Sequence, residues 1–204
     1  SVPSRIIQIG AGAHHVLALT VDGTVYAWGE NWDGQLGDGT NVARPTPTAI
    51  HGFEEPVKLV AAGEAFSIAI TDSGDIYTWG NNYDGQLAHF GADRILVPTK
   101  VPHFIDGIIE LALGAKHVLA LTAEGSVFGW GRNGSNQISE SSEYRIYTPT
   151  LIGGFDNAVV TIGTGYSSSL AVTDKGEFYV WGRIRGELLG EDYVGQRGTP
   201  QLIH

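Results

Sequence analysis

The sequence predicts an all-β protein made of four tandem repeats, and three observations carry this prediction. The dipeptide Trp-Gly recurs with a constant spacing of 51 residues, at Trp28, Trp79, Trp130 and Trp181. Four units of 51 account for all 204 residues without a gap. Short apolar stretches alternate with glycine-rich turns, and no segment keeps a helical periodicity. We expect a single domain over 1–204, with repeats at 1–51, 52–102, 103–153 and 154–204.

Each repeat is expected to hold about four strands. In the first repeat the expected elements are a strand at 6–9, a break at 10–12, a strand at 16–20, a tight turn at 22–23, a strand at 24–28, a loop at 29–44 and an extended segment at 45–50. Glycine in the turn supplies a positive φ without steric cost. The segment 24–28 alternates and is rich in β-branched and aromatic residues. Pro47 limits the last segment to an edge or to a strand start.

Seven positions are identical in all four repeats. In the first repeat they are Gly12, Ala18, Thr20, Gly23, Trp28, Gly29 and Pro47. The first of these columns continues as Gly63, Gly114 and Gly165. Four short strands in about 50 residues are typical of a β-propeller blade, and stacked blades bury their repeated apolar columns against each other. We expect the repeated tryptophan to pack between blades, with its indole N–H on a backbone carbonyl.

Three strings of the first repeat resemble those of the regulator of chromosome condensation family. They are Gly-Ala-His-His-Val-Leu-Ala-Leu-Thr at 12–20, Asp-Gly-Thr-Val-Tyr-Ala-Trp-Gly at 22–29 and Asn-Trp-Asp-Gly-Gln-Leu-Gly-Asp-Gly at 31–39. The resemblance covers the whole chain. Repeats three and four depart from the family's Gly-Gln-Leu-Gly, with Asn-Gln-Ile-Ser at 136–139 and Glu-Leu-Leu-Gly at 187–190.

The resemblance implies a propeller that normally closes with seven blades. Four repeats leave three arrangements open: an excerpt of a longer propeller, two copies that combine into a larger ring or stacked assembly, and a closed four-bladed ring. An open array would expose apolar blade faces at its two ends. We therefore expect that such an array could form a homo-oligomer through its terminal blades.

The charge balance argues against polyanionic partners. Twelve basic and 22 acidic residues give a net charge of −10, which disfavours direct binding of nucleic acid or of an anionic membrane. No apolar run reaches the roughly 18 residues of a membrane span. The chain has no cysteine, so a disulfide framework and a thiolate metal site are excluded.

Nothing in the sequence supports catalysis, a cofactor or a metal. His15 and His117 share one repeated column with Phe66 and Ser168, so we assign them a packing role. The Asp- and Asn-rich loops lack the spacing of an EF-hand and fit turn chemistry. Phosphate-binding, nucleophile-elbow and zinc-helix motifs are absent from the sequence.

Binding is the function that remains, and we expect it in the loops that follow each Trp-Gly. The candidate partner-binding residues are Trp32, Asp33, Tyr83, Asp84, Arg132, Arg183 and Arg185. Tryptophan, tyrosine and arginine are enriched at interface hot spots. The predicted function is that of a non-catalytic interaction module for a protein partner.

The resemblance leaves two principal alternatives. The family's namesake is a guanine-nucleotide exchange factor for the small GTPase Ran, but it uses a wedge inserted in a blade, for which gapless 51-residue repeats leave no room. A secreted propeller-type enzyme inhibitor would also bind through loops. The family's plant ultraviolet-B photoreceptor clusters tryptophans, whereas four of the five tryptophans here stand in the repeated column and the run Gly-Trp-Arg-His-Thr is missing.

Overall fold

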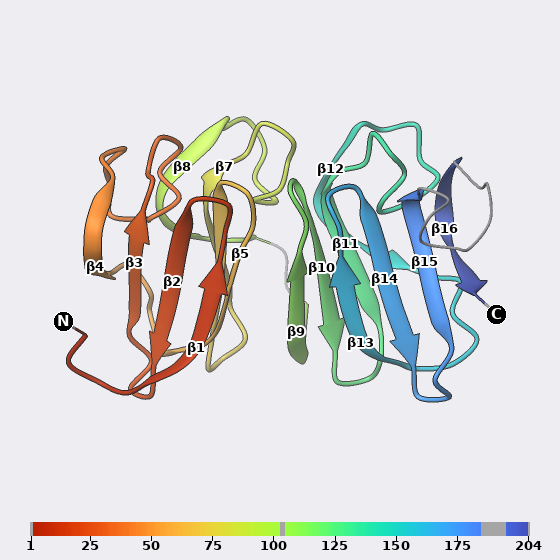
Figure 1. Ribbon diagram of the computed structural model, residues 1–204, viewed down its shortest axis with the longest axis horizontal. Helices are drawn as coiled ribbons and strands as arrows, with labels where there is room; N and C mark the ends of the chain where they lie inside the picture. The colour runs from red at the N-terminus through yellow and green to blue at the C-terminus, as the bar shows by residue number, and fades with distance from the viewer. Residues whose placement is uncertain (1, 103–104, 185–194, 204) are drawn as a thin grey trace. The chain divides into compact units, whose positions relative to one another are not determined.

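The computed structural model describes residues 2–102, 105–184 and 195–203. These residues form sixteen strands in four antiparallel sheets of four strands each (Figure 1). The first sheet holds β1 (Ile6–Ala11), β2 (His15–Thr20), β3 (Val25–Gly29) and β4 (Arg44–Ile50). The second holds β5 (Val57–Ala62), β6 (Phe66–Thr71), β7 (Ile76–Asn81) and β8 (Arg94–Lys100). The third holds β9 (Ile108–Leu113), β10 (His117–Thr122), β11 (Val127–Arg132) and β12 (Arg145–Ile152), and the fourth β13 (Val159–Thr164), β14 (Ser168–Thr173), β15 (Phe178–Ile184) and β16 (Gly195–Ile203).

Each sheet is a simple meander in which strands that follow in the chain lie side by side. The prediction of four-stranded, all-β repeats is therefore confirmed. The expected break at 10–12 begins later than predicted, because β1 continues to Ala11 and pairs with Val16. The turn at 22–23 forms as expected: Gly23 has a φ of 80°, and its N–H donates to the carbonyl of Thr20 at 2.9 Å.

Pro47 lies in β4, the last strand in the order of its sheet. A proline cannot donate to a sheet ladder, so an outermost strand suits it. The register between β3 and β4 shifts between Ala27 and Gly29, opposite the segment that carries this proline. The repeated proline thus lies in the strand at the sheet edge, as predicted for it.

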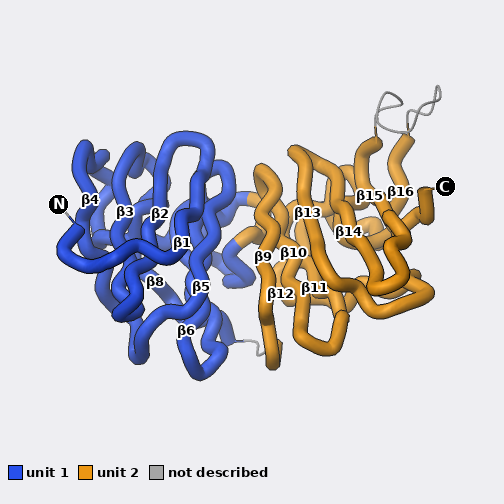
Figure 2. Tube along the Cα trace, turned by 60° about the horizontal axis from the view of Figure 1, so that its bottom comes forward, with its two compact units in different colours: residues 1–83, 87–104 blue, residues 84–86, 105–204 orange. Residues whose placement is uncertain are grey.

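The chain divides into two compact units (Figure 2). Unit 1 consists of residues 1–83 and 87–104, and unit 2 of residues 84–86 and 105–204. The core of unit 1 joins buried residues from both of its sheets, among them Leu17, Val60 and Trp79. The core of unit 2 is built in the same way, with Leu119, Ile162 and Trp181. Each unit therefore buries the facing surfaces of two sheets.

The repeated tryptophan occupies three kinds of environment. Trp79 is fully buried, and its Nε1–H donates to the carbonyl of Gln35 at 2.9 Å. Trp130 is equally buried and donates to the carbonyl of Gln86 at 3.0 Å. Trp181 is buried, but its Nε1 meets no acceptor within the described residues. Trp28, in the first repeat, is only half-buried.

The histidine column also joins neighbouring sheets. His15 Nε2 lies 2.9 Å from Ser67 Oγ, which in turn donates to the carbonyl of Gln35 at 2.8 Å. A serine hydroxyl has one proton. Because that proton goes to Gln35, His15 donates from Nε2 and is the neutral Nε2–H tautomer. Burial lowers the pKa of His15 to about 4, which agrees with a neutral ring in the packed sheet.

Unit 2 repeats this histidine arrangement. His117 Nε2 lies 3.1 Å from Ser169 Oγ, and Ser169 Oγ donates to the carbonyl of Gln137 at 2.7 Å. Burial lowers the pKa of His117 to about 4 as well. Both histidines therefore serve as neutral hydrogen-bond donors between sheets, an arrangement that fits the packing role expected of their column.

Candidate functional site

In the first three repeats, the loop that follows Trp-Gly is anchored from inside by one buried asparagine. We call these loops, at 30–43, 82–93 and 133–144, the post-tryptophan loops. Their asparagines are Asn31, Asn82 and Asn133, which are spaced by 51 residues and are at most 2% exposed. The fourth repeat has Ile184 in this column, and its loop lies outside the described residues.

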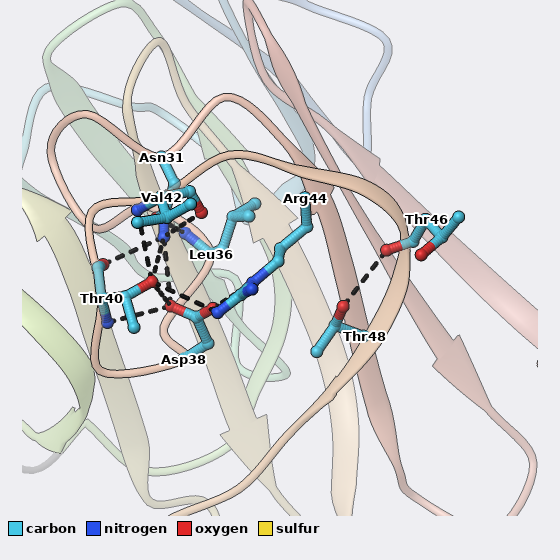
Figure 3. A network of polar contacts seen from close by, with 8 residues as sticks. All are labelled: Asn31, Leu36, Asp38, Thr40, Val42, Arg44, Thr46 and Thr48. Atoms are coloured by element: carbon cyan, nitrogen blue, oxygen red, sulfur yellow. Dashed lines mark hydrogen bonds and ion pairs between the residues drawn. The ribbon is translucent and has the colours of Figure 1, made fainter.

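Asn31 ties the two halves of the first post-tryptophan loop together (Figure 3). Its Nδ2 lies 3.0 Å from the carbonyl oxygen of Thr40 and 3.2 Å from that of Val42, and its Oδ1 accepts the N–H of Leu36 at 2.9 Å. The side chain thereby replaces a stretch of regular backbone pairing. Leu36, held in this way, is fully buried in the core of unit 1.

Asp38 adds a charged contact to the same network (Figure 3). Its Oδ2 accepts from Arg44 Nε at 2.6 Å, and its Oδ1 accepts from the hydroxyl of Thr40 at 2.7 Å. Burial opposes ionisation of this carboxyl, but the hydrogen bonds from Thr40 and the charge of Arg44 outweigh it and lower the pKa of Asp38. The loop therefore closes on an ionised carboxylate at neutral pH.

The other two asparagines make equivalent bonds. Asn82 Nδ2 donates to the carbonyls of His89 and Ala92 at 2.8 and 2.7 Å. Asn133 Nδ2 donates to the carbonyls of Ser141 and Glu143, both at 3.2 Å. Since the Asn133 amide is buried and bonded, the Asn-Gly-Ser sequence at 133–135 functions as a turn here.

A glutamine four residues after each of these asparagines completes the anchoring. The side-chain Oε1 atoms of Gln35, Gln86 and Gln137 accept the N–H of the residue two positions earlier, at 2.9 to 3.0 Å. Their backbone carbonyls are the acceptors for Trp79, Trp130 and Ser169 described above. One short motif thus holds its own turn and receives a side chain of the following sheet.

The anchored loops of unit 1 present aromatic side chains to solvent. Trp32 is 72% exposed, Tyr83 44% and Phe90 87%. Arg94, at the start of β8, donates from Nη1 to the carbonyl of Trp32 at 3.2 Å. A hydrogen bond with Tyr83, and the charges of Tyr83 and Asp33, raise the pKa of Arg94. We call Trp32, Asp33, Tyr83, Phe90 and Arg94 the unit 1 loop surface.

The structure places the remaining candidate residues differently. Asp84 is buried, and its Oδ2 lies 3.2 Å from Lys116 Nζ within unit 2. Arg132 is half-buried, with its guanidinium carbon 5.1 Å from the centre of the Tyr144 ring. Arg183 is exposed, whereas Arg185 lies outside the described residues. Because Asp84 is buried and paired with Lys116, we leave it out of the proposed surface.

Sequence reasoning missed the asparagine anchors and Arg94. The asparagines were visible as a column of three, but they stood in loops that were examined for their differences. Arg94 recurs one repeat later as Arg145, and this spacing is the signal that could have found it. The partner of Arg94 could not be predicted from the sequence, because the Trp32 carbonyl that it contacts lies 62 residues away in the chain.

Among residues 2–102, 105–184 and 195–203, no group of three His, Asp or Glu side chains is placed to hold a metal ion. The same residues contain no helix long and apolar enough to cross a membrane. The chemistry that the loops do offer is recognition, through exposed aromatic rings beside charged groups.

Four-stranded meander sheets, with Trp79 and Trp130 bonded to Gln carbonyls of the preceding repeat, define a β-propeller repeat protein. A family model described as "RCC1-like domain" matches residues 1–204. The chain belongs to this family, as the resemblance of its first repeat implied.

Several known proteins are similar to this chain in sequence or in fold. The ultraviolet-B receptor UVR8 of Arabidopsis thaliana is 32% identical over 202 residues, which cover 98% of this chain and 46% of UVR8. Human WBSCR16 superposes with a TM-score of 0.86 at 28% identity, over 99% of this chain and 54% of its own. Prp20p of Saccharomyces cerevisiae, studied for its binding to Gsp1p and histones, superposes with a TM-score of 0.87 at 24% identity. The match covers 100% of this chain and 51% of Prp20p.

These matches confirm the predicted propeller-type fold. The chain spans about half the length of the relatives it matches. At 24% identity the likeness to Prp20p shows the fold alone.

Proposed function

We propose that this chain is a non-catalytic interaction module that binds a protein partner through the unit 1 loop surface. The observation that carries the proposal is the exposure of Trp32, Tyr83 and Phe90 on loops whose backbones are fixed by buried asparagines. Exposed aromatic rings on a rigid frame lose little conformational entropy when they are covered. Scattered apolar residues need no explanation, but here one arginine, Arg94, bonds the backbone carbonyl of Trp32 and the side chain of Tyr83.

The charges around these rings suit a partner with a basic rim. Asp33 contributes to the electrostatic environment of Arg94, and the chain as a whole carries a charge of −10. Complementary charge speeds encounter and fixes orientation more than it adds affinity. We therefore assign the affinity to the aromatic side chains and the choice of partner to the charged ones.

Relatives support a role in protein binding. Prp20p is described by its binding to Gsp1p and histones, and propeller repeats in general place variable loops on a constant frame. For this chain, a protein partner and self-association through terminal blades both remain proposals. The mass in solution at several concentrations tests the second.

The loop proposal is tested with matched variants. A partner captured by the immobilised chain is identified, purified and titrated against the wild type, the double variant Trp32→Ala/Tyr83→Ala and the control Val21→Ala. Val21 is also more than half exposed, but it stands at the β2–β3 hairpin, at the other end of β3 from the loop. We expect the double variant to weaken binding by about 30-fold or more and the control to leave it unchanged. Equal affinities of the double variant and the wild type would refute the proposal.

Guanine-nucleotide exchange on a small GTPase is the second candidate, since the chain belongs to the family whose namesake is an exchange factor of this kind. The expected sign of this activity is faster release of labelled nucleotide from a panel of purified small GTPases when the chain is added. Release that stays at its intrinsic rate throughout the panel would leave binding alone as the proposed function.

A further inference from the structure

Two arginines lie directly opposite each other at one end of the third sheet. Arg132 ends β11, Arg145 begins β12, and the two are partners in the antiparallel register. Like charges in this position destabilise a sheet. The corresponding pairs elsewhere avoid the conflict, since Asn81 faces Arg94 and Arg183 faces Gln196. The double cation is therefore a feature that the repeat itself does not require.

No carboxylate compensates these two charges within the described residues. The ion pairs there involve Arg44, Lys100, Lys116 and Lys175, and neither Arg132 nor Arg145 is among them. The nearby loop residues Glu140 and Glu143 are exposed. Two guanidinium groups with no acidic partner in this part of the chain are unusual in a protein with 22 acidic side chains.

An aromatic ring holds the two arginines together. The guanidinium carbons of Arg132 and Arg145 lie 5.1 and 5.9 Å from the centre of the Tyr144 ring, a distance at which a cation is attracted to the ring face. The Nε of Arg132 is buried without a hydrogen-bond partner. Packing against the ring, and not a polar contact of this nitrogen, therefore positions the guanidinium.

Gly134 makes room for that ring. A Cβ atom built on Gly134 would fall 2.3 Å from the Tyr144 ring, closer than side chains tolerate. The same column holds Trp32 and Tyr83 in the first two repeats. In this loop of unit 2 the aromatic side chain is therefore Tyr144, beside the two arginines. The position that holds Trp32 and Tyr83 in the first two repeats is a glycine here, which leaves space for the Tyr144 ring.

We propose that Arg132, Arg145 and Tyr144 form a receptor for a carboxylate side chain on an acidic segment of a protein partner. Guanidinium groups bind carboxylates through two parallel hydrogen bonds. A carboxylate placed between the two arginines would also remove their mutual repulsion. The ring keeps both cations in position before the ligand arrives, which reduces the ordering required on binding.

A single carboxylate fits better than a polyanion. Two cations can compensate one or two negative charges, whereas the exposed Glu140 and Glu143 of the same loop would repel an extended phosphate backbone. The overall charge of −10 acts in the same direction. We therefore assign the site to an acidic protein segment and treat nucleic acid as an outcome that the test can reveal.

This inference rests on the proposed function in assuming a protein ligand, but it concerns a different set of residues. The test titrates the full chain into a fluorescein-labelled peptide, Gly-Glu-Asp-Glu-Gly, and into its uncharged match, Gly-Gln-Asn-Gln-Gly, and follows anisotropy at low salt. We expect the acidic peptide to bind at least about tenfold more tightly, and Arg132→Gln or Arg145→Gln to remove about tenfold or more of that affinity.

Arg94→Gln is the matched control, because it removes the same charge from the same column one repeat earlier. It should change the affinity less than about twofold, because Arg94 is not one of the residues of the proposed receptor. Tyr144→Phe should retain binding, since the ring is kept, and Gly134→Val should weaken it by displacing the ring.

The inference would be overturned if the two peptides bound equally well or if neither bound. It would also be overturned if Arg94→Gln lost as much affinity as Arg132→Gln, or if a single-stranded oligonucleotide displaced the acidic peptide at a lower concentration than the unlabelled peptide does. The Trp32→Ala/Tyr83→Ala variant should bind the acidic peptide as the wild type does. Failure of this receptor and failure of the unit 1 loop surface are therefore separate results.

Discussion

Trp79 and Trp28 occupy the same column of the repeat and have different environments. Trp79 is fully buried and donates to the carbonyl of Gln35, which belongs to the loop of the preceding repeat. Trp28, in the first repeat, is only half-buried. The difference shows that the repeat encodes the tryptophan, while the loop of the preceding repeat supplies its acceptor and much of its cover.

Trp181 refines this comparison. Its indole is as buried as that of Trp79, yet Nε1 has no acceptor within the described residues. The carbonyl of Gln35 accepts hydrogen bonds from both Ser67 and Trp79. Within the described residues, the equivalent carbonyl of Gln137 accepts from Ser169 and not from Trp181. Burial and hydrogen bonding of this column are thus separable contributions to stability.

The largest expected effect comes from removing the buried indole. Trp79→Ala should lower the free energy of unfolding by about 4 kcal/mol, the usual cost of emptying a buried aromatic site. Trp28→Ala should cost about 2 kcal/mol or less, because part of its surface already meets water. Urea titration followed by circular dichroism measures both. Equal losses would contradict the idea that the preceding loop makes the difference.

Acid should weaken both histidine contacts between sheets. The folded pKa of His15 and of His117 is lowered to about 4 from an ordinary value near 6.5. Their contribution is therefore complete above about pH 6.5 and is lost as the pH falls toward about 4, by up to about 3 kcal/mol for each group. The unfolding free energy measured across this window should decline, and His15→Gln/His117→Gln should flatten the decline. An unchanged slope in the double variant would assign the acid sensitivity to other groups.

The smallest effect separates burial from hydrogen bonding. Trp79→Phe removes an indole N–H that is bonded to Gln35 and leaves that carbonyl with one donor fewer, so it should cost about 1 kcal/mol more than Trp181→Phe. Thermal unfolding of the two variants under one set of conditions measures the difference. A larger loss for Trp181→Phe would show that its buried Nε1 has a partner of comparable strength.

The sequence predicted the fold because the repeat makes each structural position visible several times. Trp79, Gly23 and Pro47 can each be placed in a blade from the repeat alone. The loops were harder, because their contacts join residues that are far apart in the chain. Asp84 resembled an exposed loop acid, but Lys116, 32 positions away, pairs with it. The anchoring role of Asn31 depends on carbonyls from the returning half of the loop.

The sequence prediction and the surfaces proposed from the structure share only some residues, for the same reason. Trp32 and Tyr83 were identified by residue type and are exposed in the structure. Arg94 and Arg145 were missed because they stand where the loops rejoin the sheet, outside the segment directly after Trp-Gly. Spatial neighbours, and not residue type, distinguish an arginine that contacts Tyr83 from one that contacts Tyr144.

The central claim is that the anchored loops of the first two repeats receive the tryptophan of the next sheet and leave their own tips exposed. Hydrogen exchange of the tryptophan indole N–H protons, followed by nuclear magnetic resonance, tests it most directly. Protection follows from buried, bonded N–H groups. The account predicts that the Trp79 and Trp130 protons exchange orders of magnitude more slowly than those of Trp28 and Trp32. Equally fast exchange of all four would contradict it.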